Sequence, residues 1–317
     1  MKKRIVILGT GGTISGTSAL ASDNLGYSAG ELGIASLLEA IPIKFLSSLQ
    51  IEVEQIAQLD SKDMSFAVLQ ALAQRVDTLL VMTNVVGIVI THGTDTLEET
   101  AFFLQQVCKP SKPVVLTCAM RPATSFFSDG PQNLLDALAV ASCDDTSGVF
   151  VVCAGRIHHA VHVQKIHNYR LDAFSSGDAG CCGFVEEGQV RFVSVLPTAQ
   201  QSTVECAVKK IMFPVSNDGW PRVEILMNFV GVNGSLVHAL LAQGVDGIVV
   251  AGTGNGTIHQ SLEAALLHAR TEGVAIVVAT RCVDGYVLQV AGRQFDGSAG
   301  LSPVKARIAL ILKLLSN

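Results

Sequence analysis

The chain has 317 residues, of which 49% are hydrophobic and 15% charged, and its formal net charge is −5. A typical globular domain carries about 25% charged residues, so this composition indicates extensive buried surface. Part of that surface can lie in interfaces between subunits of an oligomer. The acidic balance argues against a nucleic-acid partner, which needs a basic face, and no apolar stretch has the length of a membrane span. A chain of this length predicts two domains.

The first element in chain order is a short apolar run, Ile5–Leu8, which follows three basic residues, Lys2-Lys3-Arg4. The run is shorter than the hydrophobic region of a signal peptide, and glycine and threonine follow it at once. We therefore expect a buried first strand in a cytoplasmic protein. The alternative, a signal peptide that has already been removed, stays open.

Apolar runs that predict strands then alternate with amphipathic stretches that predict helices. The runs are apolar throughout rather than alternating, which is typical of a parallel sheet with helices on both faces. This βαβ pattern predicts an α/β fold with a larger N-terminal sheet. The predicted strands are Arg4–Leu8, Gln50–Ile56, Gly87–Thr91, Pro113–Cys118 and Val149–Cys153, and the predicted helices are Ser65–Val76, Thr96–Val107 and Asn133–Ala141.

The alternation breaks after His158 and resumes near residue 223. One more strand is predicted over Gln189–Leu196, and the stretch that follows it resembles a linker. We therefore predict an N-terminal domain at residues 1–197, a linker at 198–221 and a smaller C-terminal α/β domain at 222–317. The elements predicted for the second domain are Val223–Met227, Ser235–Gln243, Gly247–Ala251, Ser261–Glu272, Val274–Thr280 and Ser302–Leu315.

Cysteines and histidines raise the question of disulfides and metals. No Cys-x-x-Cys pair occurs and most cysteines lie in apolar runs, so we expect buried, reduced thiols. His159 and His162 would share a face only on a helix, and neither a helical pattern nor a suitably spaced acidic or cysteine ligand accompanies them. We therefore expect no metal and no cofactor. The residues concerned are Cys108, Cys118, Cys143, Cys153, Cys181, Cys182, Cys206, Cys282, His158, His159, His162 and His167.

A glycine-rich segment, Gly9–Gly16, follows the first predicted strand. A dinucleotide-binding fingerprint would need glycine where Ile14 stands, and a phosphate-binding P-loop would need a lysine that is absent. What remains is the hydroxyl of Thr13 at the carboxyl end of a strand, where open α/β sheets bind ligands. The hypothesis of a nucleotide-dependent oxidoreductase is therefore supported by the glycines alone, and it is kept as a distant alternative.

Three other segments carry polar groups that suit catalysis. Thr94, between a strand and a helix, either caps the helix or presents its hydroxyl, and the Asp95 carboxylate beside the helix N-terminus can bind an ammonium group. Lys165 is a surface group unless the fold removes it from water, in which case its amine can act as a base. Ala119–Pro122 and Asp129–Leu134 predict by themselves only a turn and a helix start.

Together these segments resemble the bacterial-type L-asparaginase family over essentially the whole chain. The resemblance implies two α/β domains and cofactor-free hydrolysis of the side-chain amide of L-asparagine at the carboxyl end of the N-terminal sheet. It also implies a homotetramer of two intimate dimers, in which a neighbouring C-terminal domain completes each site. The segments that match in family order are Thr10–Ile14, Thr91–Thr96, Ala119–Pro122, Asp129–Pro131, Lys165 and Ala251–Gly256.

Carried over by position, the resemblance implies two catalytic groups. Thr13 is implied to be the nucleophile with Tyr27 as its phenolic partner on the same loop, and Thr94 a second threonine beside Lys165 and Asp95. Threonine attacks an amide only with a nearby base and a stabilised oxyanion. The residues alone do not decide which threonine attacks, and the resemblance favours Thr13. An acyl-threonine intermediate would release ammonia before the acid.

Substrate recognition is implied for Ser61, which would hold the α-carboxylate, for Asp95, which would hold the α-ammonium, and for Asn255, which would reach in from the neighbouring subunit. Lys62 stands where the family usually has Gln or Glu, so it would set a cation near the ammonium unless its long stem turns away. Asp284 is the only acid in the segment where some relatives supply a glutamate. Both departures weaken the expectation of efficient recognition of L-asparagine.

Backbone N–H groups of the Gly93–Asp95 turn are the expected oxyanion donors. A glutaminase-leaning enzyme, or another amidohydrolase that acts on ω-amides, is the nearest alternative. An amino-acid-binding protein without activity would be expected to lose the two threonines or Lys165, and all three are present.

Overall fold

The structure is a computed structural model that describes residues 3–39, 41, 50–144, 146–194 and 213–316. The chain divides into two compact units, Met1–Thr203 and Val204–Asn317, and each is described here by itself. Both units are α/β, as predicted, with the larger sheet in the first. The predicted linker at 198–221 falls mostly outside the described residues.

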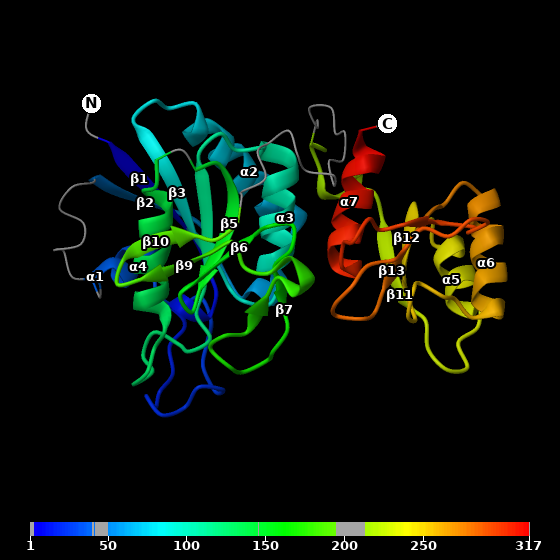
Figure 1. The fold of residues 1–317 in the computed structure, drawn as a ribbon, viewed down its shortest axis with the longest axis horizontal. Helices are drawn as coiled ribbons and strands as arrows, with labels where there is room; N and C mark the ends of the chain where they lie inside the picture. The colour runs from blue at the N-terminus through cyan, green and yellow to red at the C-terminus, as the bar shows by residue number, and fades with distance from the viewer. Residues whose placement is uncertain (1–2, 40, 42–49, 145, 195–212, 317) are drawn as a thin grey trace. The chain divides into compact units, whose positions relative to one another are not determined.

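The first unit is built on an eight-stranded sheet of order β10-β9-β6-β5-β4-β3-β1-β2 (Figure 1). The five strands from β2 to β5 are parallel, and the three at the other edge pair antiparallel. The strands are β1 Arg4–Gly11, β2 Gln50–Leu59, β3 Val85–Thr91, β4 Pro113–Thr117, β5 Gly148–Cys153, β6 Arg156–His159, β9 Gly183–Glu186 and β10 Gln189–Phe192.

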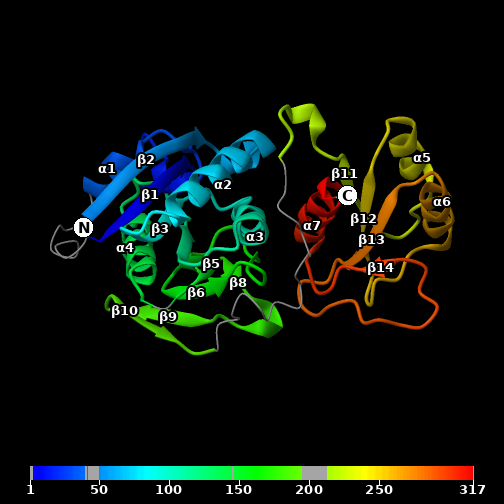
Figure 2. The same cartoon turned by 90° about the horizontal axis from the view of Figure 1, so that it is seen from above.

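Helices cover both faces of this sheet, which explains the uniformly apolar strands. α1 (Ile34–Glu39) and α4 (Gly130–Ala141) lie on one face, and α2 (Phe66–Leu80) and α3 (Leu97–Cys108) on the other (Figure 2). The core on the α1 and α4 side includes Ile5 from β1, which is fully buried.

In the first unit, strand β6 was missed and the end of β10 was predicted wrongly. The chain continues after β5 through a tight turn in which Ala154 and Gly155 both have positive φ, 49° and 71°, into β6, which was not predicted. β10 ends at Phe192 rather than Leu196, because Val193 and Ser194 leave the strand and later residues lie outside the described part. Two further unpredicted pieces, β7 (Gln164–Lys165) and β8 (Phe174–Ser175), form a separate two-stranded sheet.

The second unit has a four-stranded parallel sheet of order β11-β12-β13-β14. Helices α5 and α6 pack on one face and α7 on the other (Figure 1). Trp220, the single tryptophan of the sequence, is buried in this unit with its ring 5.9 Å from that of Phe213. The elements are β11 Val223–Met227, α5 Ser235–Ala242, β12 Gly247–Gly252, α6 Gln260–Thr271, β13 Ala275–Thr280, β14 Asp296–Gly297 and α7 Pro303–Leu315.

The described cysteines are free thiols, and Cys206 lies outside the described residues. Cys118, Cys153 and Cys182 are buried, and burial raises the pKa of the Cys182 thiol to about 12. Cys282 is exposed, so the expectation of burial is wrong for this residue. In the described part of the chain, no helix combines the length and apolar character needed to cross a membrane.

Candidate active site

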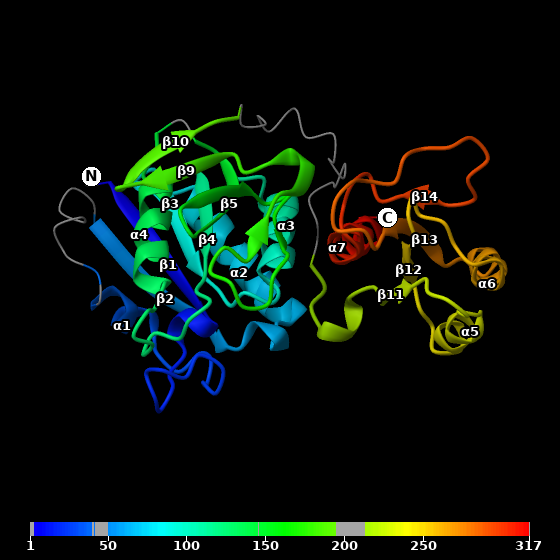
Figure 3. The same ribbon diagram turned by 60° about the horizontal axis from the view of Figure 1, so that its bottom comes forward.

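Three neighbouring strand ends meet at one edge of the large sheet. β1 lies between β2 and β3, in parallel register with both, so the loops that follow them leave from the same edge (Figure 3). These loops carry Thr13, Ser61 and Thr94, whose residues are 7%, 2% and 6% exposed. Residues that are 33 to 81 positions apart in sequence are thereby brought together.

Glycines allow the three loops to approach at the backbone level. Gly12 has a φ of 84°, and a Cβ built on it would overlap the backbone of Gly93. A Cβ on Gly93 would in turn overlap the Ser61 hydroxyl. Gly12 therefore needs glycine for both conformation and space, and Gly93 needs it for space.

The first hydroxyl group belongs to Thr13, which opens a short 3₁₀ helix, Thr13–Ser15, directly after β1. Its Oγ1 lies 2.7 Å from the phenolic oxygen of Tyr27. The loop that carries Tyr27 is closed by a bridge between Thr17 and Ser28. The structure thus brings together the two residues predicted to form the first catalytic group.

The second hydroxyl group belongs to Thr94. Lys165 Nζ donates to Thr94 Oγ1 at 2.8 Å and to Asp95 Oδ1 at 2.6 Å, and Thr94 Oγ1 lies 3.5 Å from the same carboxylate oxygen. The Lys165 side chain is only 18% exposed, so the fold does withdraw it from water. Its backbone N–H also reaches Glu98 Oε1 at 3.4 Å. Thr94, Asp95 and Lys165 therefore form one hydrogen-bonded group that can pass a proton.

The alternative role of Thr94 as a helix cap is wrong. Helix α3 begins at Leu97, and Thr96 holds the N-cap position without a capping side-chain bond. The Thr96 hydroxyl donates instead to the backbone oxygen of Ser61 at 2.8 Å. This bond ties the start of α3 to the loop after β2.

Ser61 Oγ accepts a hydrogen bond from the Asp95 N–H at 3.2 Å. One of the expected oxyanion donors is therefore already engaged. Among the described residues, the Thr94 N–H has no hydrogen-bond partner and the Ser61 hydroxyl proton has no acceptor. Both groups can therefore bind a substrate oxygen.

Lys62 is paired within its own turn. Its ammonium lies 2.8 Å from Asp60 Oδ2 and 3.1 Å from Asp63 Oδ2, and its side chain is 61% exposed. The hydrogen bonds to Asp60 and then Asp63 raise the pKa of Lys62. Its positive charge is thus offset by two neighbouring carboxylates. The sequence analysis, which considered position 62 by itself, did not predict this pairing.

Asn255 and Asp284 lie in the second unit. The Asn255 side chain accepts from the Leu288 N–H at 2.6 Å and reaches the Leu288 oxygen at 3.4 Å. The carboxylate of Asp284 is in an exposed turn. Within its own chain, Asn255 therefore braces the 283–290 loop.

Sequence reasoning missed the role of Asp129, for which it predicted only a helix start. The partly buried carboxylate accepts from the backbone N–H groups of Met120 at 3.0 Å and Arg121 at 2.9 Å, and from Asn133 Nδ2 at 3.1 Å. Burial raises the pKa of Asp129, and these hydrogen bonds offset only part of that effect. Asp129 thereby fixes the segment that follows β4, next to the ends of β3 and β1.

The histidines do not form a metal centre in the described part of the chain, which holds no group of three or more His, Cys, Asp or Glu placed to bind an ion. His158 and His159 lie on strand β6, so the helical geometry that a shared site would need is absent. His158 Nδ1 instead bonds to Ser176 Oγ at 2.8 Å.

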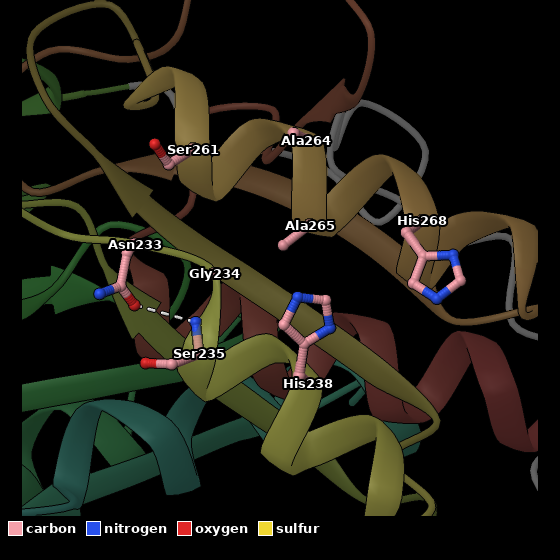
Figure 4. Close-up of a pocket in the computed structure, with 8 residues that line it drawn as sticks. All are labelled: Asn233, Gly234, Ser235, His238, Ser261, Ala264, Ala265 and His268. Atoms are coloured by element: carbon pink, nitrogen blue, oxygen red, sulfur yellow. Dashed lines mark hydrogen bonds between the residues drawn. The ribbon is translucent and has the colours of Figure 1, made fainter.

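A pocket of about 470 Å³ lies in the second unit, between α5 and α6 (Figure 4). The hydrogen bond between its lining residues joins the Ser235 N–H to Asn233 Oδ1. No described bond links the Ser235 or Ser261 hydroxyl to an imidazole of the pocket. It therefore lacks the hydroxyl–base pair found in the first unit. The lining residues are Asn233, Gly234, Ser235, His238, Ser261, Ala264, Ala265 and His268.

Comparisons with known proteins agree with this geometry. Residues 4–197 match the family model "Asparaginase, N-terminal" and residues 222–317 match "Glutaminase/Asparaginase C-terminal domain". The chain is 36% identical to L-asparaginase 2 of Bacillus subtilis over 98% of its own length and 82% of that protein, and 36% identical to glutaminase-asparaginase of Pseudomonas fluorescens over 98% and 86%. A solved structure, a probable cytoplasmic L-asparaginase from Campylobacter jejuni, superposes with a TM-score of 0.90 at 37% identity and covers 100% of this chain and 96% of that one.

The fold and the paired hydroxyl groups define a two-domain α/β enzyme of the amidohydrolase class. The chain belongs to the asparaginase family, as its ordered motifs predicted.

Proposed function

We propose that this protein hydrolyses the side-chain amide of L-asparagine to L-aspartate and ammonia, with Thr13 as the nucleophile. The observation that carries the proposal is the pair of hydroxyl groups on adjoining strand ends: Thr13 with Tyr27, and Thr94 with Lys165 and Asp95. Two such groups around one substrate serve the two halves of an acyl-enzyme reaction.

In the first half, Thr13 Oγ1 bonds to the amide carbon while its proton leaves through the Tyr27 oxygen, 2.7 Å away. The proton ends on the amide nitrogen, the carbon–nitrogen bond breaks, and ammonia departs from an acyl-threonine ester. The Thr94 N–H is our candidate donor to the oxyanion. In the second half, water attacks the ester, and the group formed by Thr94, Lys165 and Asp95 carries protons so that Thr13 recovers its hydroxyl.

Recognition of the substrate is proposed for Ser61 and Asp95. A free hydroxyl proton on Ser61 suits a carboxylate, and the Asp95 carboxylate, whose side chain is 52% exposed, suits an ammonium. Asn255 is proposed to act from a second copy of the chain. No metal, cofactor or nucleic acid enters this scheme.

We infer a homo-oligomer, most simply a tetramer, in the cytoplasm. Large apolar side chains on the first unit support an interface, since Leu20, Leu25, Phe126 and Phe127 are 66% to 84% exposed. The name of the Campylobacter jejuni protein supports the cytoplasm, although a Haemophilus influenzae relative, 36% identical, is named a probable periplasmic L-asparaginase.

The test is ammonia release by the purified protein from L-asparagine and L-glutamine in parallel, with and without a chelator. We expect turnover of L-asparagine that survives chelation. Higher kcat/KM for L-glutamine would favour the second candidate, a glutaminase, which the name of the Pseudomonas fluorescens relative supports. Activity that disappears on chelation and returns with zinc would contradict the metal-free scheme.

A further inference from the structure

His92 lies between the end of β3 and the loop that carries Thr94, and the mechanism above gives it no role. Its residue is fully buried, and its backbone N–H donates to the Thr117 oxygen at 2.9 Å, which extends the pairing of β3 with β4. Both ring nitrogens have partners. Nδ1 lies 2.7 Å from the Gly93 oxygen, and Nε2 lies 2.9 Å from Thr100 Oγ1.

These two contacts determine the protonation of the ring. A carbonyl oxygen only accepts, so the proton must be on Nδ1, and Nε2 is left to accept from the Thr100 hydroxyl. Burial lowers the pKa of His92 to about 4, although the bond to Gly93 acts in the opposite direction. The imidazole is therefore neutral at pH 7 and held in its Nδ1–H tautomer.

The bond to Gly93 bears directly on the reacting groups. A peptide unit is planar and trans, so fixing the direction of the Gly93 carbonyl also fixes the direction of the Thr94 N–H. That N–H has no hydrogen-bond partner in the described part of the chain, and the Thr94 hydroxyl is on the same residue. Glycine at position 93 has no side chain to restrict the peptide, so another group must hold it.

We propose that His92 is a positioning residue: its Nδ1–H holds the Gly93–Thr94 peptide in the orientation needed for hydrolysis, and Thr100 on α3 locks the tautomer. The proposal rests on the proposed function. It assigns His92 no contact with substrate.

The test compares two substitutions that a positioning role and a packing role rank in opposite order. In His92→Asn, the amide nitrogen replaces Nδ1 as a donor to Gly93, although a cavity is left near Thr100. In His92→Leu, apolar volume is kept and the donor is lost. We expect kcat to fall about tenfold or less in His92→Asn and about a hundredfold in His92→Leu, with KM within about threefold in both. A kcat of His92→Leu that equals or exceeds that of His92→Asn would show that the ring only fills space, and would overturn the proposal.

The tautomer supplies a second readout that is independent of activity and of variants that fail to fold. Long-range ¹H–¹⁵N spectra of ¹⁵N-histidine-labelled protein show which ring nitrogen carries the proton, and the His92 signal is the one lost in His92→Asn. A neutral Nδ1–H ring at pH 7 supports the proposal, and an Nε2–H or doubly protonated ring overturns it. Failure of the proposed function is seen separately, as a wild-type protein that releases no ammonia from L-asparagine, and the kcat comparison is then made on the amide that it does hydrolyse.

Discussion

Thr13 and Thr94 both present a hydroxyl at a strand end, but different side chains accompany them. Thr13 meets a phenol, which can relay a proton, whereas Thr94 meets an ammonium and a carboxylate, which can stabilise and exchange charge. A threonine hydroxyl is a weak nucleophile at neutral pH, so its partner groups decide what it can do. The two residues are therefore expected to serve different steps.

We predict that Thr13→Ala and Thr94→Val each reduce kcat about a thousandfold or more and leave the fold intact, because each removes a hydroxyl that takes part in bond making or proton transfer. Steady-state ammonia release and circular dichroism measure the two effects. Thr78→Val, which removes a helix-surface hydroxyl bonded to Gln74, is the matched control and should keep full activity. A variant at 13 or 94 with about a tenth of the wild-type rate would assign that threonine a merely structural role.

Lys62 illustrates how local partners change the meaning of a substitution. Because its ammonium is paired with Asp60 and Asp63, we expect Lys62→Gln and Lys62→Met to change KM for L-asparagine by less than about twofold. An analogue that lacks the α-amino group is the control substrate. If KM for L-asparagine alone falls fivefold or more in both variants, Lys62 does repel the substrate ammonium, and a native substrate with a blocked or absent α-amino group becomes the better hypothesis.

At the scale of elements, the contact between the loops after β1 and β3 is sensitive to added atoms. We predict that Gly12→Ala abolishes activity and lowers the free energy of unfolding by about 2 kcal/mol or more, because a methyl group there overlaps the Gly93 backbone at a positive φ. Gly33→Ala is the matched control, since its Cβ would come no closer than 3.9 Å to Gln55. Urea denaturation of both variants measures the effect, and equal stability would contradict the close approach.

The turn that His92 holds should also make stability depend on pH. The pKa of His92 is about 4 in the folded chain and about 6.5 in an unfolded one, so the unfolded state alone takes up a proton between these values. The stabilisation of the folded chain that follows from this pKa difference is complete above pH 6.5. It is lost as the pH falls toward 4, which lowers the free energy of unfolding by roughly 3 kcal/mol in total. We predict that the free energy of unfolding drops less between pH 7 and pH 4.5 in His92→Asn than in the wild type. Parallel slopes in the two proteins would contradict this.

The elements that could be predicted from the sequence are those whose environment leaves a clear pattern. β1, β3, β4 and β5 are buried on both faces and apolar over most of their length, so they were predicted to within a few residues. β6, β7 and β9 are two to four residues long and carry histidine, lysine or glycine, and the turn into β6 uses Ala154 at positive φ, for which sequence gives little signal.

The candidate site, too, could be predicted only in part from the sequence. The strand ends predicted Thr13 and Thr94, but nothing local joins Lys165 to Thr94 across 71 positions, and only resemblance to a family put them together. The hydrogen bonds of Asp129 and His92 depend on backbone groups of distant segments, which leave no periodic trace in the sequence.

At the scale of the whole molecule, the proposed function requires more than one copy of the chain. We predict a mass near four times 33.3 kDa by light scattering, and loss of activity on dilution into monomers. Asn255→Ala should lower activity further than Asn233→Ala, a change at an exposed position of the same unit. A fully active monomer would show that no residue acts from a second copy.

The position of Trp220 gives the two units separate reporters. The single indole is buried in the second unit, whereas the hydroxyl groups proposed for catalysis belong to the first. Tryptophan emission during denaturation therefore follows the second unit alone, whereas enzyme activity also requires the first unit. A gap between the two transition curves would reveal that one half of the chain melts before the other, and coincident curves would mean that both lose structure as a single cooperative body.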